Sequence, residues 1–346
     1  MSDFAIAWLD PQPEEEVAFA QDLLPVGFRI EAPRQADPDE LSALVAKADA
    51  LVTQHAPVDA QLLERAQRAR LIQKYGRRED GLDLAAAAAA AKTVSVMPLS
   101  GCIAVAELAV TLVLALSKQL VRADATTRSG AYRELGLEPK PTSQAVHAFQ
   151  WMKLPLFEVH GKTLGIVGYG EIGTEASIRA RAFGMDVLYT KRQRLPEAVE
   201  QRYDVEWAEL DDLLARSDFV LLSLPHTAES ERIIGGRELG LMQPSAFLVN
   251  IARGGLVDEE ALVAALRDGG IAGAALDVFV EEPVPSDHPL LGLDNVILTP
   301  HIGGGSGGAK VIQMRDVLDN VVRFAQGKQP LHVINGSSSK DGGVAC

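Results

Sequence analysis

The sequence predicts an α/β protein of two domains, each a doubly wound parallel sheet with helices on both faces. Three observations lead to this fold class. Short apolar runs alternate with helical patterns in two successive series along the chain. A G-x-G-x-x-G turn stands between a strand and a helix in the second series. The 346 residues suffice for two domains that each bury a core of their own.

The first series begins at the N-terminus. Its expected strands are FAIAWL, FRIEA, ADALVT, LIQKYG and TVSVM, at residues 4–9, 28–32, 48–53, 71–76 and 93–97. Helices are expected from Pro13, Pro38, Val58 and Asp83, and the alanine run 85–91 favours a short helix because alanine is the best helix former. These elements together predict βαβ units around a parallel sheet.

A long apolar helix over 104–127 is expected to link the two series, and the segment 128–160 after it has no clear periodicity. The second series then predicts strands at 162–168, 186–190, 218–225, 245–252, 272–278 and 295–299. Its helices are expected at 172–183, 211–217, 258–269 and 309–326. The Gly/Ser-rich tail 336–346 is predicted to be disordered.

Composition limits the classes of partner and the location. The net charge of −14 and the pI of about 5.0 argue against nucleic acid or an anionic membrane, because both would be repelled. Two cysteines, Cys102 and Cys346, cannot form a disulfide framework, so a reducing, cytoplasmic location is expected. Neither a signal peptide nor an apolar segment long enough to cross a bilayer is expected, and no metal site is predicted.

The glycines of the turn predict a dinucleotide site. Gly168 permits the tight turn, Gly170 lets the backbone approach a pyrophosphate, and Gly173 lets the helix pack on the strand. The N-terminus of that helix then faces the phosphates. The alternative is a glycine-rich turn in some other α/β domain.

The next strand ends without the acidic residue that usually meets the adenosine ribose. Thr190 stands there, and Lys191 and Arg192 follow, with Arg194 two residues further on. A hydroxyl and positive charges suit a 2′-phosphate, so the cofactor is expected to be NADP(H), with NAD also possible. The alternative is that these basic residues form a solvated turn beside a neutral ribose contact.

Three polar residues, Arg253, Glu282 and His301, stand just past strand ends. Because the carboxyl ends of parallel strands share one edge, we expect them to converge beside the dinucleotide. Arg253 could bind a carboxylate or a polarised carbonyl, and His301 could donate a proton to the oxygen while Glu282 orients the imidazole and favours its protonated form. Each residue alone is more often structural; together they suit hydride transfer to a 2-keto acid.

The stretches GKTLGIVGYGEIG, LVNIARGGLVDEEALVAALRDGGIAGAALDVF, EEP and LDNVILTPHIGGG resemble the D-isomer-specific 2-hydroxyacid dehydrogenases. The segment VLYTKRQR is similar to the corresponding stretch of NADPH-preferring glyoxylate and hydroxypyruvate reductases. The resemblance implies a Rossmann cofactor domain, 119–303, inserted into a discontinuous flavodoxin-like substrate domain, 1–118 and 304–335. It also implies a 2-keto or 2-hydroxy acid substrate and a homodimer.

The resemblance further assigns site residues. It implies that Arg253, Glu282 and His301 are catalytic and that Asp277 lies near the nicotinamide carboxamide. Further cofactor contacts are implied at Glu171, Ile172, Pro225, Ala252 and Gly303. Substrate contacts are implied at Arg77, Arg78 and Glu79, together with Arg253 and His301.

The chain departs from the family pattern where substrate is expected. Arg78 stands where a glycine is usual, Gly101 replaces a common asparagine, and the segment before the fingerprint is long. Two other functions stay open. One is a cofactor-sensing co-repressor on the same scaffold, which keeps the same three catalytic-type residues. The other is oxidation of formate, although the formate dehydrogenases have glutamine where Glu282 stands.

Overall fold

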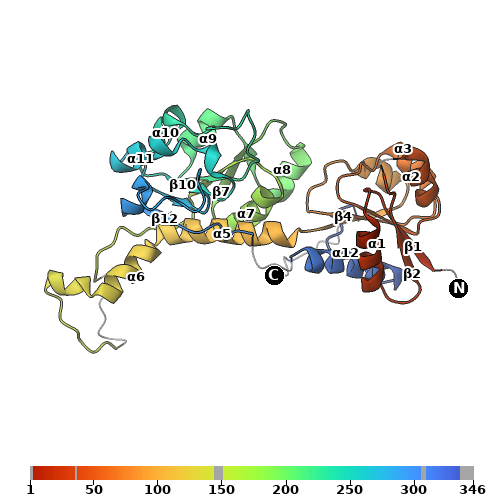
Figure 1. Ribbon diagram of the computed structural model, residues 1–346, viewed down its shortest axis with the longest axis horizontal. Coiled ribbons are helices and arrows are strands. Elements are labelled where there is room, and N and C mark those ends of the chain that lie inside the picture. The colour runs from red at the N-terminus through yellow and green to blue at the C-terminus, as the bar shows by residue number, and fades with distance from the viewer. Residues whose placement is uncertain (1–2, 36, 144–150, 305–308, 336–346) are drawn as a thin grey trace. The chain divides into compact units, whose positions relative to one another are not determined.

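The structure is a computed structural model that describes residues 3–35, 37–143, 151–304 and 309–335 (Figure 1). The chain divides into two compact units, one of Met1–Gly101 with Ser306–Cys346 and one of Cys102–Gly305. Each unit holds one parallel sheet with helices on both faces, which confirms the predicted fold class. The predicted disordered tail 336–346 lies outside the described residues.

The first unit contains a five-stranded sheet in the order β2-β1-β3-β4-β5. This order is that of flavodoxin-like sheets. The strands are β1 (Phe4–Trp8), β2 (Phe28–Glu31), β3 (Ala50–Thr53), β4 (Leu71–Tyr75) and β5 (Thr93–Met97). The helices are α1 (Glu14–Leu23), α2 (Pro38–Val45), α3 (Ala60–Arg65), α4 (Leu84–Ala89) and α12 (Ala309–Ala325).

Alternation along each strand builds the core of the first unit. On β1, Ile6 and Trp8 enter the cluster that includes α1 and α12, whereas Ala7 and Leu9 enter the cluster on the opposite face. Both faces are apolar because both are covered, as expected for a parallel sheet. Since α12 comes from the C-terminal part of the chain, this unit is discontinuous.

The second unit contains a seven-stranded sheet in the order β12-β11-β10-β9-β6-β7-β8. This is the doubly wound Rossmann arrangement, with its switch point between β6 and β9. The strands are β6 (Thr163–Val167), β7 (Asp186–Thr190), β8 (Glu206–Trp207), β9 (Phe219–Leu222), β10 (Phe247–Asn250), β11 (Gly273–Leu276) and β12 (Val296–Leu298).

Helices cover both faces of this second sheet. Residues of α5 and α7 join one apolar cluster, and residues of α9, α10 and α11 join the other. The helices are α5 (Ser100–Ser117), α6 (Leu120–Ser129), α7 (Glu171–Ala182), α8 (Glu197–Tyr203), α9 (Leu210–Arg216), α10 (Gly236–Leu241) and α11 (Glu259–Arg267). Short 3₁₀ turns occur at η1 (Ala131–Leu135), η2 (Gly254–Leu256) and η3 (Pro289–Gly292).

The long helix expected over 104–127 is interrupted. It ends at Ser117, Gln119 takes a left-handed φ of 49°, and α6 starts afresh at Leu120. The break coincides with a crossing segment, because Phe157 donates its N–H to the Ser117 carbonyl and Lys118 Nζ donates to the Phe157 carbonyl. The helix therefore ends where it meets a segment far away in the sequence, although the residues that follow also favour a helix.

The apolar helix α5 packs with the second unit, whereas the sequence analysis placed 1–118 in the substrate domain. Ala109, Leu112 and Leu116 lie in the cluster that α7 also joins, so the compact unit begins at Cys102. By length and composition alone α5 could cross a membrane, which the sequence analysis did not expect. The apolar composition of α5 is explained by the face that it buries in the second unit, as in the core helix of a globular domain.

Candidate functional site

The fingerprint turn joins β6 to α7 and brings two backbones very close together. Gly168 has a φ of 91°, and a Cβ there would lie 2.5 Å from the Leu224 Cβ and 2.8 Å from the Leu224 amide nitrogen. A Cβ on Gly173 would lie 2.9 Å from the Gly168 carbonyl oxygen. Only glycine fits either place, so both glycines are required by the geometry of the turn.

The first turn of α7 follows the fingerprint loop directly. Its N-cap is Gly170, which has no capping side chain, and Glu171, Ile172 and Gly173 form the first turn. Backbone N–H groups at such a helix end are donors suited to an anion. The glycine cradle and the uncapped helix end have the chemistry that a dinucleotide pyrophosphate requires.

The basic strand end follows β7 directly. Gly168 donates its N–H to the Thr190 carbonyl oxygen at 3.0 Å, so Thr190 lies beside the fingerprint turn. Lys191 is half-buried and Arg192 is exposed. The hydroxyl and the two charges therefore lie at the edge of the sheet that carries the glycines.

Arg194, two residues further on, is bound within the loop. Its guanidinium forms two 2.8 Å hydrogen bonds with the buried Glu200 and lies 5.6 Å from the centre of the Trp207 ring. The Arg194 hydrogen bond is the main reason that the pKa of Glu200 is below its ordinary value. Tyr189 also donates to Glu200 at 2.6 Å and accepts from the Leu195 amide. These contacts hold the loop at both ends and leave Arg194 structural.

The three catalytic candidates follow neighbouring strands. Arg253 comes after β10, Glu282 after β11 and His301 after β12, and these strands are adjacent and parallel. The carboxyl ends of β10–β12 therefore present all three residues on the edge that also carries the fingerprint turn.

His301 and Glu282 form a direct pair. The Nδ1 atom of His301 lies 2.7 Å from Oε2 of Glu282, and Oε1 of Glu282 accepts the Phe279 N–H at 3.0 Å. The His301 hydrogen bond holds the pKa of the Glu282 carboxyl below its ordinary value; the Phe279 amide and the charge of Arg253 act in the same direction, against partial burial. The carboxylate is thus ionised at neutral pH and engages one ring nitrogen of the imidazole.

Asp277 holds the turn that carries His301. It is buried, its Oδ1 accepts from the Thr299 hydroxyl and the Ile302 N–H, and its Oδ2 accepts from the Gly303 N–H. The His301 N–H bonds to the Asp277 carbonyl, and His301 takes a left-handed φ of 55°. Asp277, which the resemblance links to the nicotinamide, therefore also fixes the turn that carries the candidate residue His301.

Two residues that the sequence analysis did not single out fix Arg253. The buried Asn250 donates Nδ2–H to the Arg253 carbonyl and accepts the Ala252 N–H. A Cβ on Gly254 would lie only 1.9 Å from the Phe279 carbonyl carbon. The chain after β10 therefore packs against the loop that leads to Glu282, and the first glycine of ARGG was the available signal in the sequence.

The remaining predicted residues lie in two loops. Pro225 follows β9, in a loop whose turn is fixed because the Ser230 hydroxyl donates to the Pro225 carbonyl. Arg77, Arg78 and Glu79 follow β4 in the first unit, where Arg78 forms an ion pair with Asp80. Among the described residues no group of histidine, cysteine and carboxylate side chains could hold a metal ion.

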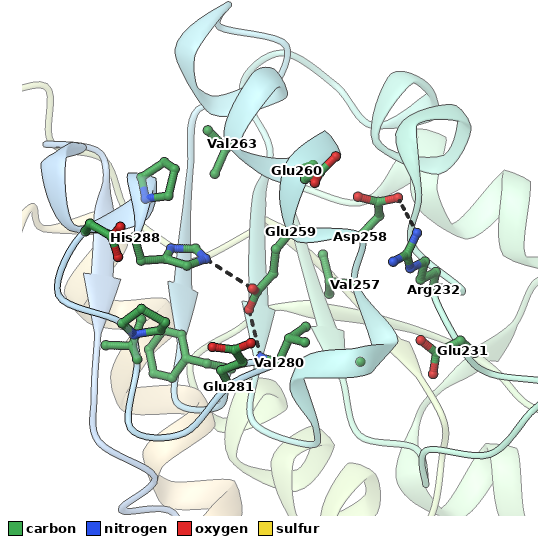
Figure 2. A pocket seen from close by; sticks show the side chains of 16 residues that line it. Glu231, Arg232, Val257, Asp258, Glu259, Glu260, Val263, Val280, Glu281 and His288 are labelled. Carbon is green, nitrogen blue, oxygen red and sulfur yellow. Dashed lines mark hydrogen bonds and ion pairs between the residues drawn. The ribbon is translucent and has the colours of Figure 1, made fainter.

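A pocket of about 690 Å³ borders the loop before Glu282 (Figure 2). It is lined by the start of α11, by residues 231–232 and 255, and by residues 279–281, 284–285 and 287–289; none of the three catalytic candidates lines it. Its polar side chains are mainly acidic, with Glu259 between His288 and Val280. No residue of the fingerprint turn lines this pocket.

Several known proteins are similar to this chain. A family model for the NAD binding domain of D-isomer specific 2-hydroxyacid dehydrogenases matches residues 110–303. A glyoxylate reductase of Thermococcus gammatolerans is 40% identical over 318 residues, covering 91% of this chain and 92% of the relative. One from Thermococcus onnurineus is 41% identical over 288 residues, 83% of each chain. A solved glyoxylate reductase from Paecilomyes thermophila is 28% identical with a TM-score of 0.54, covering 96% and 99%.

Proposed function

The chain belongs to the D-isomer specific 2-hydroxyacid dehydrogenases, and from that premise we propose that it reduces glyoxylate, or a 2-keto acid of similar size, with NADPH as the preferred cofactor. As a member of this family it is an oxidoreductase that reduces a 2-keto acid with a nicotinamide cofactor. The His301–Glu282 pair, at the sheet edge that also bears Arg253 and the fingerprint, carries the proposal. The names of the curated relatives support glyoxylate as the substrate.

Each catalytic candidate has a distinct task in this proposal. A nicotinamide cofactor bound at the fingerprint turn would supply the hydride for the reduction of the keto acid. Arg253 binds the carboxylate of the keto acid and polarises its carbonyl through a planar fork of donors. Because Glu282 engages Nδ1 of His301, Nε2 is the nitrogen that donates a proton to the carbonyl oxygen. The proton is replaced from solvent after the hydroxy acid leaves.

Different observations favour the enzyme over the other two functions. The co-repressor keeps the same three residues, so they do not separate the two; the curated relatives, which are reductases, favour the enzyme. Oxidation of formate is disfavoured because Glu282, rather than the glutamine of the formate enzymes, faces His301.

We propose that Thr190, Lys191 and Arg192 bind the 2′-phosphate of NADPH. The strand end has no carboxylate that would repel the phosphate, and the Tyr189–Glu200–Arg194 contacts hold the loop in place. Charge-assisted hydrogen bonds are worth about 1.5–3 kcal/mol each, so two should favour NADPH over NADH at least about tenfold in kcat/KM.

The double variant Lys191→Ala with Arg192→Ala is expected to lose this preference. The NADPH-to-NADH ratio of kcat/KM should fall at least about tenfold, with NADH kinetics little changed, because only the phosphate contacts are removed. The Kd of each cofactor, measured by fluorescence titration, should change in the same way. Arg267→Ala is the matched control, since it removes a positive charge at the end of α11, ahead of β11. A wild-type preference for NADH, or a ratio unaffected by the double variant, would contradict the assignment.

The substrate is tested by steady-state reduction of glyoxylate, hydroxypyruvate, pyruvate and bulkier keto acids.

We propose that Arg78 selects the substrate. It forms an ion pair with Asp80, and it stands where family members usually have a glycine, so its guanidinium is available to bind a second polar group of the substrate. If Arg78→Gly leaves KM unchanged for every accepted acid, Arg78 does not select the substrate.

We further propose that the protein is a cytoplasmic homodimer. Large apolar side chains on and after α6 are exposed: Leu120, Val121, Leu135, Leu137, Trp151 and Leu156. Tyr132 meets Trp151 edge-on at 5.2 Å, and residues 144–150 of the same segment lie outside the described residues. Exposed large apolar side chains gathered in one segment are typical of interfaces, and light scattering would show whether a dimer forms. The free thiol of Cys102 fits a reducing compartment.

A further inference from the structure

The loop between β11 and Glu282 is held by more than Glu282 itself. Its Phe279–Val280 peptide lies against Gly254 on one side, where no side chain would fit. Phe279 donates its N–H to the Glu282 carboxylate at 3.0 Å. Val280 donates its N–H, also at 3.0 Å, to the carboxylate of Glu259, which lies outside the loop.

Glu259 is well placed to fix this peptide. It is the first residue of α11, whose N-cap is Asp258, and its side chain is only 15% exposed. Its Oε1 accepts the Val280 N–H, and its Oε2 lies 3.2 Å from Nε2 of His288 (Figure 2). Both carboxylate oxygens are therefore engaged, one by the catalytic loop and one by the segment that follows it.

His288 completes the arrangement. Its Nδ1 accepts the Leu290 N–H, so in the neutral ring the hydrogen resides on Nε2 and points to Glu259. The side chain of His288 is 17% exposed, which keeps the pair largely shielded from water. A continuous set of contacts thus runs from His288 through Glu259, Val280 and Phe279 to Glu282 and His301.

We propose that Glu259 is a positioning residue for the reaction: it fixes the Phe279–Val280 peptide and thereby sets the distance between Glu282 and His301. Glu259 does not touch the reacting groups. It acts through Glu282, and the inference therefore rests on the proposed catalytic roles of Glu282 and His301. A misplacement of about 1 Å at a catalytic group can cost up to about a hundredfold in rate, so small shifts of this loop matter.

The neighbouring Glu260 provides a matched control. It lies in the same first turn of α11 and lines the same pocket, but its side chain is exposed (Figure 2). Replacing either glutamate with alanine removes one carboxylate from the positive end of the helix, so both lose the same favourable interaction with the helix dipole. Any difference between the two variants reports the contacts with Val280 and His288.

The test compares Glu259→Ala, Glu259→Gln and Glu260→Ala in the reduction of a keto acid that the wild type accepts. Glu259→Ala should lower kcat between about tenfold and a hundredfold, with the Kd of NADPH at the wild-type value. Glu259→Gln keeps one acceptor oxygen for the Val280 N–H and should recover part of the loss. Glu260→Ala should behave as wild type.

A double-variant cycle with Glu282→Gln separates positioning from general destabilisation. If Glu259 acts through Glu282, Glu259→Ala should change kcat little in the Glu282→Gln background. Equal effects in both backgrounds, or a wild-type kcat for Glu259→Ala, would overturn the proposal. If Glu259→Ala does not fold, the same cycle with Glu259→Gln decides. A wild type that reduces no keto acid would instead refute the proposed function.

Discussion

Replacing His301 with alanine is expected to lower kcat for reduction of the keto acid by a factor on the order of 10² or more. The variant lacks the imidazole whose Nδ1 is paired with Glu282 at 2.7 Å, so the developing alkoxide has no positioned proton donor. Because His301 lies after β12 and the glycine cradle lies between β6 and α7, the fingerprint turn should be intact. Single-turnover kinetics and the Kd of NADPH would show a loss in the chemical step with cofactor binding preserved.

His160→Ala is the control for the loss of a histidine. His160 is exposed and precedes β6, so it lies at the opposite edge of the same sheet from the catalytic candidates. Near-normal turnover by His301→Ala would contradict the role of His301, whereas equal losses in both variants would indicate a general effect on the unit.

Arg253→Ala is expected to reduce kcat/KM for the keto acid by about a hundredfold or more, since two charge-assisted hydrogen bonds of about 1.5–3 kcal/mol each are lost. The loss should appear largely as a raised KM, because the guanidinium binds the carboxylate in the ground state as well as in the transition state. Arg253→Lys should recover only part of it, because a lysine ammonium cannot form the planar fork. Steady-state kinetics with saturating NADPH measure both constants.

The Arg267→Ala variant again controls for loss of charge. An unchanged KM and kcat in Arg253→Ala would exclude contact between Arg253 and the substrate. A loss of thermal stability would instead suggest that the hydrogen bond from Arg253 Nη1 to the Ala252 carbonyl is structural.

Much of the fold followed from the sequence because its signals are local. Continuous apolar runs such as FAIAW and FVLL, which suit strands covered on both faces, became β1 and β9. Aspartates ahead of helical segments became N-caps, as Asp59 and Asp83 did for α3 and α4. The order of strand ends also sufficed to bring Arg253, Glu282 and His301 to one edge.

The features that sequence reasoning missed depend on contacts between distant residues. The break at Gln119 follows from hydrogen bonds with Phe157, and β8 is a two-residue edge strand with no apolar alternation. Arg194 looked like one more phosphate ligand, but Glu200, six residues on, binds it. Glu259 looked like an ordinary first-turn acid until the structure placed the Val280 amide beside it.

The measurement that tests the account most directly is steady-state oxidation of NADPH by the purified protein in the presence of glyoxylate, beside the same assay with NADH. We expect saturable reduction of glyoxylate, with kcat/KM at least about tenfold higher for NADPH than for NADH. The absence of turnover with glyoxylate and with every other 2-keto acid of the panel, in a protein that binds NADPH, would contradict the central claim.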